Sequence, residues 1–215
     1  MRNKKIPKIK YIFNLAKKMP YFGFDDLVGV ETDRIYLKIL FSRYEKSGRV
    51  VRLKRGMYVA KEYLDNLEKK GRLSAYLELI SNILYEPCYL SLDYVLYKHN
   101  LLTEVPVNFT LVSCRKTKTF ANVLGGFFYH KIKKNLFRGF TATHKEGDFM
   151  ILEATKAKAL FDFLYFRKNF LSNKESVEEL RLNLADFTGK NKAELLSYAK
   201  IEKSKKMKIL ITHLF

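Results

Sequence analysis

The sequence predicts an α+β fold that is divided into two domains. Near the N-terminus, stretches with helical spacing of apolar residues are followed at once by a short alternating segment, RVVRLKRGMYVA, at residues 49–60. From residue 71 onward, helical stretches are interspersed with strand-like runs such as VNFTLVSC and FMILEA. We therefore expect a small helical domain with a β-hairpin over residues 1–70, and a mixed α/β domain over residues 71–215.

Three helices are expected in the N-terminal domain. The first covers about Lys8 to Met19, and Pro20 ends it. A second, short helix is expected in GFDDLVGV. Thr32 is the expected N-cap of a third and longer helix, which ends at Gly48.

The third helix carries apolar residues on more than one side. One stripe at helical spacing consists of Leu37, Leu40, Phe41 and Tyr44. Ile35 and Ile39 widen the apolar arc beyond that of a simple surface helix. We therefore expect this helix to be packed on two sides.

The segment after the third helix has the pattern of a β-hairpin with a cationic face. Arg52 and Lys54 alternate with Val51 and Leu53, which predicts that the apolar pair faces inward and the cations face water. Gly56 stands where a tight reversal needs a positive φ. Three helices followed by a hairpin is the element order of a winged helix-turn-helix, in which the hairpin is the wing. A solvated amphipathic surface hairpin is the alternative.

The charge balance favours an anionic partner. The 215 residues include 41 Lys and Arg against 22 Asp and Glu, which gives a net charge of +19 and a pI of about 9.8. Nucleic acid is the first expected partner, an anionic membrane surface the second and an acidic protein the third. No apolar run approaches the roughly 18 residues that span a bilayer, and lysines interrupt the N-terminal segment, so we expect a cytoplasmic location and no membrane partner.

A set of DNA-contacting residues follows from the winged-helix hypothesis. The long helix would enter the major groove, and the wing would neutralise phosphate charge. The candidates are Arg34, Tyr36, Lys38 and Arg43 on the helix and Arg49, Arg52, Lys54 and Arg55 on the hairpin.

A second cationic region is expected in the C-terminal domain. No Asp or Glu occurs from Val105 to Lys145, and two basic clusters, CRKTKTF and YHKIKKNLFR, lie within this window. If the strands that carry them pair, their cations share one face of a sheet. Lysines that merely keep strand edges soluble are the alternative. The expected basic surface consists of Arg115, Lys116, Lys118, Lys131, Lys133, Lys134 and Arg138.

Familiar catalytic and metal-binding patterns are absent from the sequence. There is no GxGxxG, GxxxxGK[ST], HExxH or GxSxG, and the four histidines lack metal-ligand spacing. Cys88 and Cys114 are far apart in sequence, so two buried thiols in a reducing compartment are expected. We expect no enzymatic activity, no cofactor and no metal.

A metal-dependent nuclease is the competing hypothesis for the C-terminal domain. Asp93 and Glu104 could join Lys116 or Lys131 in such a site, which needs clustered carboxylates to hold magnesium. Asp93 is better explained as a first-turn acid in a helix capped by Ser91. A protein-interaction module that docks onto an acidic partner is a third hypothesis.

Several blocks of the sequence resemble one known family. GFDDLVGV and LFSRYEKSGRVVRLKRGMYV resemble the winged helix-turn-helix of AbiEi-type antitoxins from type IV toxin-antitoxin systems. EPCYLSLDYVLYKHNLLTEVPVNFTLVSCRKTKTF, GFFYHKIKKNLFRGF and ILEATKAKALFDFLYF resemble successive blocks of that family's C-terminal domain. The blocks cover about two-thirds of the chain. Lys156 stands where related sequences more often have proline, and the resemblance ends before Lys174.

The resemblance implies a transcriptional regulator with an antitoxin role. In that family the N-terminal domain binds double-stranded DNA at the operator of the antitoxin's own operon. This binding represses the operon. The functional partner is a nucleotidyltransferase-like toxin encoded alongside, and the pair acts in abortive infection as a defence against phage.

Overall fold

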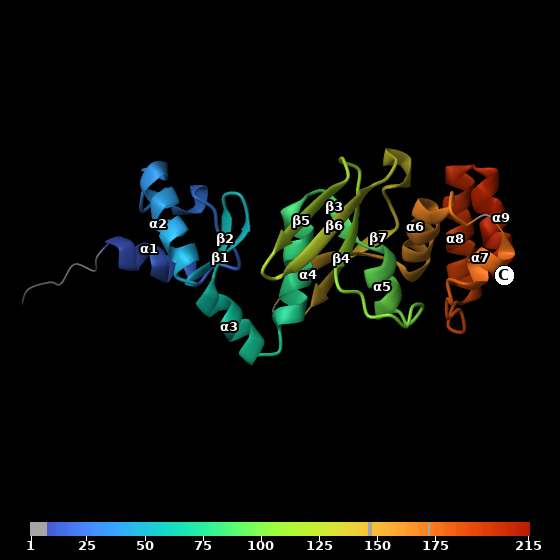
Figure 1. Cartoon of the computed structure of the whole chain (residues 1–215), viewed down its shortest axis with the longest axis horizontal. Helices are drawn as coiled ribbons and strands as arrows, with labels where there is room; N and C mark the ends of the chain where they lie inside the picture. Colours follow the sequence, from blue (N-terminus) through green and yellow to red (C-terminus); the bar gives the residue numbers. More distant parts are fainter. Residues whose placement is uncertain (1–7, 146–147, 172) are drawn as a thin grey trace, which may run out of the picture. The chain divides into compact units, whose positions relative to one another are not determined.

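The computed structural model describes residues 8–145, 148–171 and 173–215 (Figure 1). It contains helices, one two-stranded sheet and one six-stranded sheet. The larger sheet is mixed, because it combines parallel and antiparallel strand pairs. The α+β fold class predicted from the sequence is therefore confirmed. None of the described helices is both long and apolar enough to cross a membrane.

The described chain forms two compact units. The first unit contains the residues up to Leu77 together with the segment Asn122–Leu124, and the second contains the remainder. The sequence-based division after residue 70 falls in the turn between helices α3 (Lys61–Lys69) and α4 (Leu73–Leu84), and α4 continues through Leu77.

The first unit begins with helices and continues into a hairpin, as expected. The short helix in GFDDLVGV is a single 3-10 turn. Each element follows the previous one after a short connection. The elements are α1 (Lys8–Ala16), η1 (Asp25–Leu27), α2 (Arg34–Lys46), β1 (Val50–Lys54), β2 (Met57–Ala60), α3 (Lys61–Lys69) and α4 (Leu73–Leu84), of which the last runs on into the second unit.

Asp33 caps α2, and the expectation that Thr32 does so is wrong. The Oδ1 atom of Asp33 accepts hydrogen bonds from the backbone N–H groups of Ile35, at 2.8 Å, and Tyr36, at 3.0 Å. Both Thr and Asp suit an N-cap, but the carboxylate also interacts favourably with the positive end of the helix dipole. The helix therefore starts one residue later than expected.

Only one side of α2 is buried. Leu37, Leu40 and Phe41 belong to the core, as predicted. Ile35 and Ile39 are 73% and 49% exposed, so the expectation that α2 packs on two sides is wrong. At about 100° per residue, these two isoleucines lie on the side of the helix opposite Leu40 and Phe41.

The hairpin forms around Gly56, but its alternation is irregular. Strands β1 and β2 are antiparallel, and Gly56 has a φ of +77°. The register shifts between Arg52 and Lys54 by a β-bulge, which inserts one extra residue into β1. Val50 and Leu53 are consequently the buried residues of β1, whereas Val51, expected to face inward with Leu53, is only half-buried.

The second unit is built on the six-stranded sheet. The strands are β3 (Cys88–Leu90), β4 (Phe109–Ser113), β5 (Lys118–Asn122), β6 (Gly125–Lys131), β7 (Phe140–Lys145) and β8 (Phe149–Ala154). The helices are α5 (Leu92–Lys98), η2 (Lys134–Leu136), α6 (Lys156–Arg167), α7 (Lys174–Glu178), α8 (Gly189–Glu202) and α9 (Lys205–Leu214). The strand order in the sheet is β5-β6-β4-β3-β8-β7. Helix α6 packs against α5, α8 and α9, and α7 packs against α9 (Figure 1).

A buried ion pair lies within α6, and hydrogen bonds to its carboxylate join the helix to the sheet. The Nζ atom of Lys158 donates to Oδ1 of Asp162 at 2.6 Å, and both side chains are fully buried. Oδ2 of Asp162 accepts hydrogen bonds from the hydroxyls of Ser91, at 2.8 Å, and Tyr89, at 3.1 Å. Burial raises the pKa of Asp162 and lowers the pKa of Lys158, and the attraction within the pair opposes both shifts. Ser91 occupies the N-cap position of α5, but its hydroxyl donates a hydrogen bond to Asp162 and does not cap the helix.

The two cysteines differ in exposure. Cys88 is buried in β3, and burial raises the pKa of its thiol to about 12. Cys114 is only partly buried, so the expectation of two buried thiols holds for Cys88 alone. Both thiols are free.

We expect Lys158→Met to lower the free energy of unfolding of the second unit by about 3–5 kcal/mol, because the substitution leaves the Asp162 carboxylate buried without a cation. Urea denaturation followed by circular dichroism measures the change. Lys156→Met is the matched control, since Lys156 lies on the same helix, is partly exposed, and its Nζ donates to the Asp186 carbonyl at 3.4 Å. A Lys158→Met protein as stable as this control would contradict a structural role for the pair.

Candidate nucleic-acid interface

The β1–β2 hairpin is held beside α2 by paired backbone and packed aromatic rings. The backbone N–H groups of Phe22 and Tyr58 each donate to the other residue's carbonyl, both at 2.8 Å, so Phe22 adds a third short strand segment next to β2. The Phe41 ring of α2 lies 5.1 Å from the Phe22 ring and 5.5 Å from the Tyr58 ring. All three rings are buried. The position of the hairpin relative to α2 is therefore fixed by core packing.

The exposed face of α2 combines cations with small and apolar side chains. Lys38 and Ser42 are exposed and one turn apart, and Lys46 follows one turn later. Ile35 and Ile39 lie beside this row. Glu45, the acidic residue of α2, is exposed beside this row, three residues after Ser42.

Four residues of α2 were predicted to contact DNA, and their environments differ. Lys38 lies on the exposed face described above, and Arg43 is exposed at its edge. Arg34 is exposed but forms an ion pair with Asp25 of η1. Tyr36 is only partly exposed.

Sequence reasoning missed Ser42 and Lys46 as candidate contacts. Their spacing from Lys38, at i+4 and i+8, was the available signal. It was overlooked because the expected second packed side placed Ile35 and Ile39 in the core instead of on this face.

Most cations of the hairpin point into solvent. Arg52 in β1 and Arg55 in the turn are exposed. Arg49 is also exposed, and its guanidinium carbon lies 5.4 Å from the centre of the Tyr44 ring. Lys54 is partly buried, because the β-bulge turns this end of β1 away from regular alternation. Arg49, Arg52 and Arg55 are thus the hairpin cations best placed to meet an external anion.

The two basic clusters of the second unit meet at one end of its sheet. Strands β4 and β6 are parallel and pair Ser113 with Lys131, so their carboxyl ends lie together. One cluster follows β4 and continues into the edge strand β5, which pairs with β6, while the other begins at the end of β6. This group, which we term the cationic edge, consists of the exposed residues Arg115, Lys116, Lys118, Lys131, Lys133 and Lys134.

Aromatic rings support two cations of this edge. The guanidinium carbon of Arg115 lies 4.5 Å from the centre of the Tyr85 ring, and its Nη1 donates to the Glu86 carbonyl at 2.9 Å. The Nζ atom of Lys118 lies 4.9 Å from the centre of the Phe120 ring. Tyr85 and Phe120 are each partly exposed. Such rings beside cations are able to stack on an unpaired base.

Arg138 does not belong to the cationic edge. The chain leaves β6 at one side of the sheet and crosses through η2 to β7 at the other side, where Phe140 pairs with Ala154. Arg138 precedes this pairing and lies near α6: burial lowers the pKa of Lys158, and the positive charge of Arg138 lowers it further. The expectation that Arg138 shares a surface with Arg115 is therefore not met, because the crossover separates them.

The residues considered for a nuclease site are only partly brought together. Asp93 and Glu104 line one cavity of about 320 Å³. However, Nη2 of Arg167 donates to Oδ1 of Asp93 at 2.9 Å, and Lys116 and Lys131 belong to the cationic edge and do not line this cavity. Within the described parts of the chain, no group of three or more His, Cys, Asp or Glu residues is arranged to bind a metal ion.

No model of a protein family matches the chain, and no curated protein gives a significant match. The likeness to AbiEi-type antitoxins is thus a resemblance of sequence blocks.

Proposed function

We propose that the first unit is a winged helix-turn-helix that binds double-stranded DNA, and that the chain is a transcriptional regulator. The order of α1, the Phe22 segment, η1, α2 and the β1–β2 hairpin supports this assignment. The observation that carries it is the buried contact of Phe41 with Phe22 and Tyr58, because it makes the cationic hairpin and the exposed face of α2 parts of one rigid body.

In the proposed complex α2 lies in the major groove. Lys38, Ser42 and Lys46 reach base edges or phosphates, and Ile35 and Ile39 supply apolar contact for thymine methyl groups. Arg52 and Arg55 approach the phosphate backbone from the hairpin. Phosphate contacts supply most of the affinity, and α2 supplies the sequence preference.

The cationic edge of the second unit is proposed as an additional nucleic-acid surface. Its six cations are exposed, and no Asp or Glu occurs between Val105 and Lys145. Tyr85 and Phe120 add rings on which a base can stack. This surface either strengthens binding to the operator or engages a second nucleic acid.

The sequence resemblance extends the proposal to a biological role. We propose an AbiEi-like antitoxin that represses its own operon and counteracts a nucleotidyltransferase-like toxin, without enzymatic activity of its own. The DNA upstream of its own gene is accordingly the first duplex to test, in an electrophoretic mobility-shift assay against a duplex of scrambled sequence. Equal affinity for both would leave a non-specific nucleic-acid binder in place of a repressor.

Incubation with magnesium and labelled DNA or RNA tests the absence of enzymatic activity. We expect both nucleic acids to remain intact. Cleavage that disappears in Asp93→Asn or Glu104→Gln would instead favour a nuclease.

Replacing Arg52 and Arg55 by alanine should weaken binding to every duplex. The slope of log K against log salt concentration is negative, and two lost phosphate contacts reduce its magnitude by about 1.8, at about 0.9 per contact. Fluorescence anisotropy over a salt series gives the slope. Lys69→Ala with Lys70→Ala, two exposed residues at the end of α3, removes the same charge elsewhere in the first unit. If the magnitude of the slope decreases equally in both variants, the hairpin is not part of the interface.

Ser42→Ala together with Lys38→Ala should reduce sequence preference. A good base contact is worth about 1–3 kcal/mol of discrimination, so the preferred duplex should lose more affinity than a scrambled one. Competition binding of both duplexes measures the difference. The control is Lys10→Ala with Lys18→Ala, at exposed positions in and after α1. An equal loss for the two duplexes would show that this face of α2 does not read bases.

Replacing Lys116, Lys131 and Lys134 together by alanine should reduce the magnitude of the salt slope for the nucleic acid that the cationic edge contacts. The expected change is about 0.9 per lost contact for a duplex and about 0.7 for a single strand. Titrations of the intact chain with duplex and single-stranded probes distinguish the two. If neither slope changes, these lysines only keep the strand edge soluble.

A further inference from the structure

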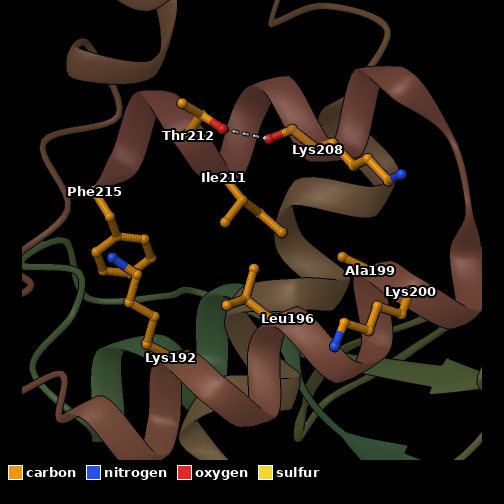
Figure 2. A pocket seen from close by; sticks show the side chains of 8 residues that line it. All are labelled: Lys192, Leu196, Ala199, Lys200, Lys208, Ile211, Thr212 and Phe215. Carbon is orange, nitrogen blue, oxygen red and sulfur yellow. Dashed lines mark hydrogen bonds between the residues drawn. The ribbon is translucent and has the colours of Figure 1, made fainter.

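A groove of about 510 Å³ runs between α8 and α9 in the second unit (Figure 2). Figure 2 shows Lys192 and Phe215 at one end, Lys200 and Lys208 at the other, and the apolar side chains between them. The lining residues are Lys192, Leu196, Ala199 and Lys200 of α8, and Lys208, Ile211, Thr212 and Phe215 of α9 and its C-cap. None of the proposals above uses this groove.

The two helices line the groove at regular spacing. Lys192, Leu196 and Lys200 stand one turn apart along α8, which places the two lysines about 12 Å from each other along the helix axis. Leu196, 39% exposed, therefore lies between two cations. Ile211 faces it from α9 and is buried.

All charged side chains that line the groove are cations. The carboxylates of α8 are engaged elsewhere: Oε1 of Glu194 accepts from the hydroxyls of Thr155, at 2.6 Å, and Tyr198, at 2.7 Å, and Oε1 of Glu202 accepts from Nζ of Lys168, at 2.5 Å. Helix α9 contains no Asp or Glu. The apolar side chains in the middle of the groove are thus flanked at both ends by lysines. No Asp or Glu of α8 or α9 neutralises these lysines.

One of the end cations is positioned in advance. The Nζ atom of Lys192 lies 4.3 Å from the centre of the Phe215 ring. The Phe215 ring also stacks on Phe187, with the ring centres 5.6 Å apart. A packed ring below the ammonium group lowers the conformational entropy that Lys192 loses when it binds an anion.

We propose that this groove binds a short amphipathic helix of a partner protein, in which apolar side chains are flanked by Asp or Glu about one turn before and after. Two neighbouring helices form a groove of the kind that receives the apolar face of a third helix. The volume accommodates a few side chains, within the range of about 300–1,000 Å³ that is usual for binding pockets. A nucleic-acid backbone would satisfy the lysines but would leave Leu196 without an apolar partner, so an acidic amphipathic peptide fits both features. This inference does not depend on DNA binding by the first unit.

A synthetic peptide tests the proposal with the intact chain. The probe is a fluorescein-labelled, alanine-based helix of about 16 residues, with Glu at positions i and i+7 and Leu at i+3 and i+4, all on one face. A second peptide has Lys in place of both Glu residues, and a third has Ala in place of both Leu residues. Fluorescence anisotropy should show binding of the first peptide, and at least about tenfold weaker binding of the other two.

Matched protein variants locate the site. Lys200→Ala with Lys208→Ala should weaken binding about fivefold, because two ion pairs are lost. Lys190→Ala with Lys205→Ala removes the same charge from exposed positions on the same helices and should change the affinity by less than about twofold. Leu196→Glu places an acid on the groove floor and should abolish binding. Thermal denaturation would reveal whether Leu196→Glu fails to fold. All four lysines of the two pairs are exposed, so comparing the two lysine-pair variants still tests whether the groove is the binding site.

Several results would overturn the proposal. One is equal binding of the Glu and Lys peptides, and another is an equal loss of affinity in the two lysine-pair variants. A third is a concentration-dependent dimer in sedimentation that Leu196→Glu converts to a monomer, because the occupant would then be a second copy of this chain.

Discussion

The first unit depends on the buried contact of Phe41 with Phe22 and Tyr58. These three rings come from α2, from the segment before η1 and from β2, and their contact is reinforced by the two backbone hydrogen bonds between Phe22 and Tyr58. A two-stranded hairpin alone is only marginally stable in water. Because the hairpin shares this core with α2, its exposed arginines keep a defined position relative to the exposed face of the helix, and one ligand can engage both.

In the second unit, the parallel pairing of β4 with β6 determines where the cations of the cationic edge lie. Two clusters that are separate in sequence converge because parallel strands end at the same side of a sheet. Strand β5, at the border of the sheet, adds Lys118 beside Phe120. Lysines at an exposed border also oppose edge-to-edge association, so the same residues are able to serve solubility and recognition.

Local patterns predicted much of the fold, whereas features that depend on distant contacts were missed. The long helix, the turn at Gly56 and the two basic clusters follow from spacing and composition. Burial of Ile35 was predicted wrongly, because an apolar residue at helical spacing does not reveal whether a neighbour covers it. The bulge that buries Val50 in place of Val51, and the crossover that separates Arg138 from the cationic edge, arise from pairing that no local pattern specifies. The groove between α8 and α9 was also missed, because it depends on how two helices pack together, which no local pattern specifies.

Nuclear magnetic resonance of the intact, isotope-labelled chain during titration with duplex DNA at low salt tests the central claim most directly. The backbone signals of Ile35, Lys38, Ser42 and Lys46 on α2, and of Arg52 and Arg55 on the hairpin, should shift together, while those of the buried core should change little. Non-specific duplex binding in the range of about 10⁻⁴–10⁻⁶ M is sufficient for this observation. Shifts confined to the second unit, or absent from α2 and the hairpin at saturating DNA, would contradict the account.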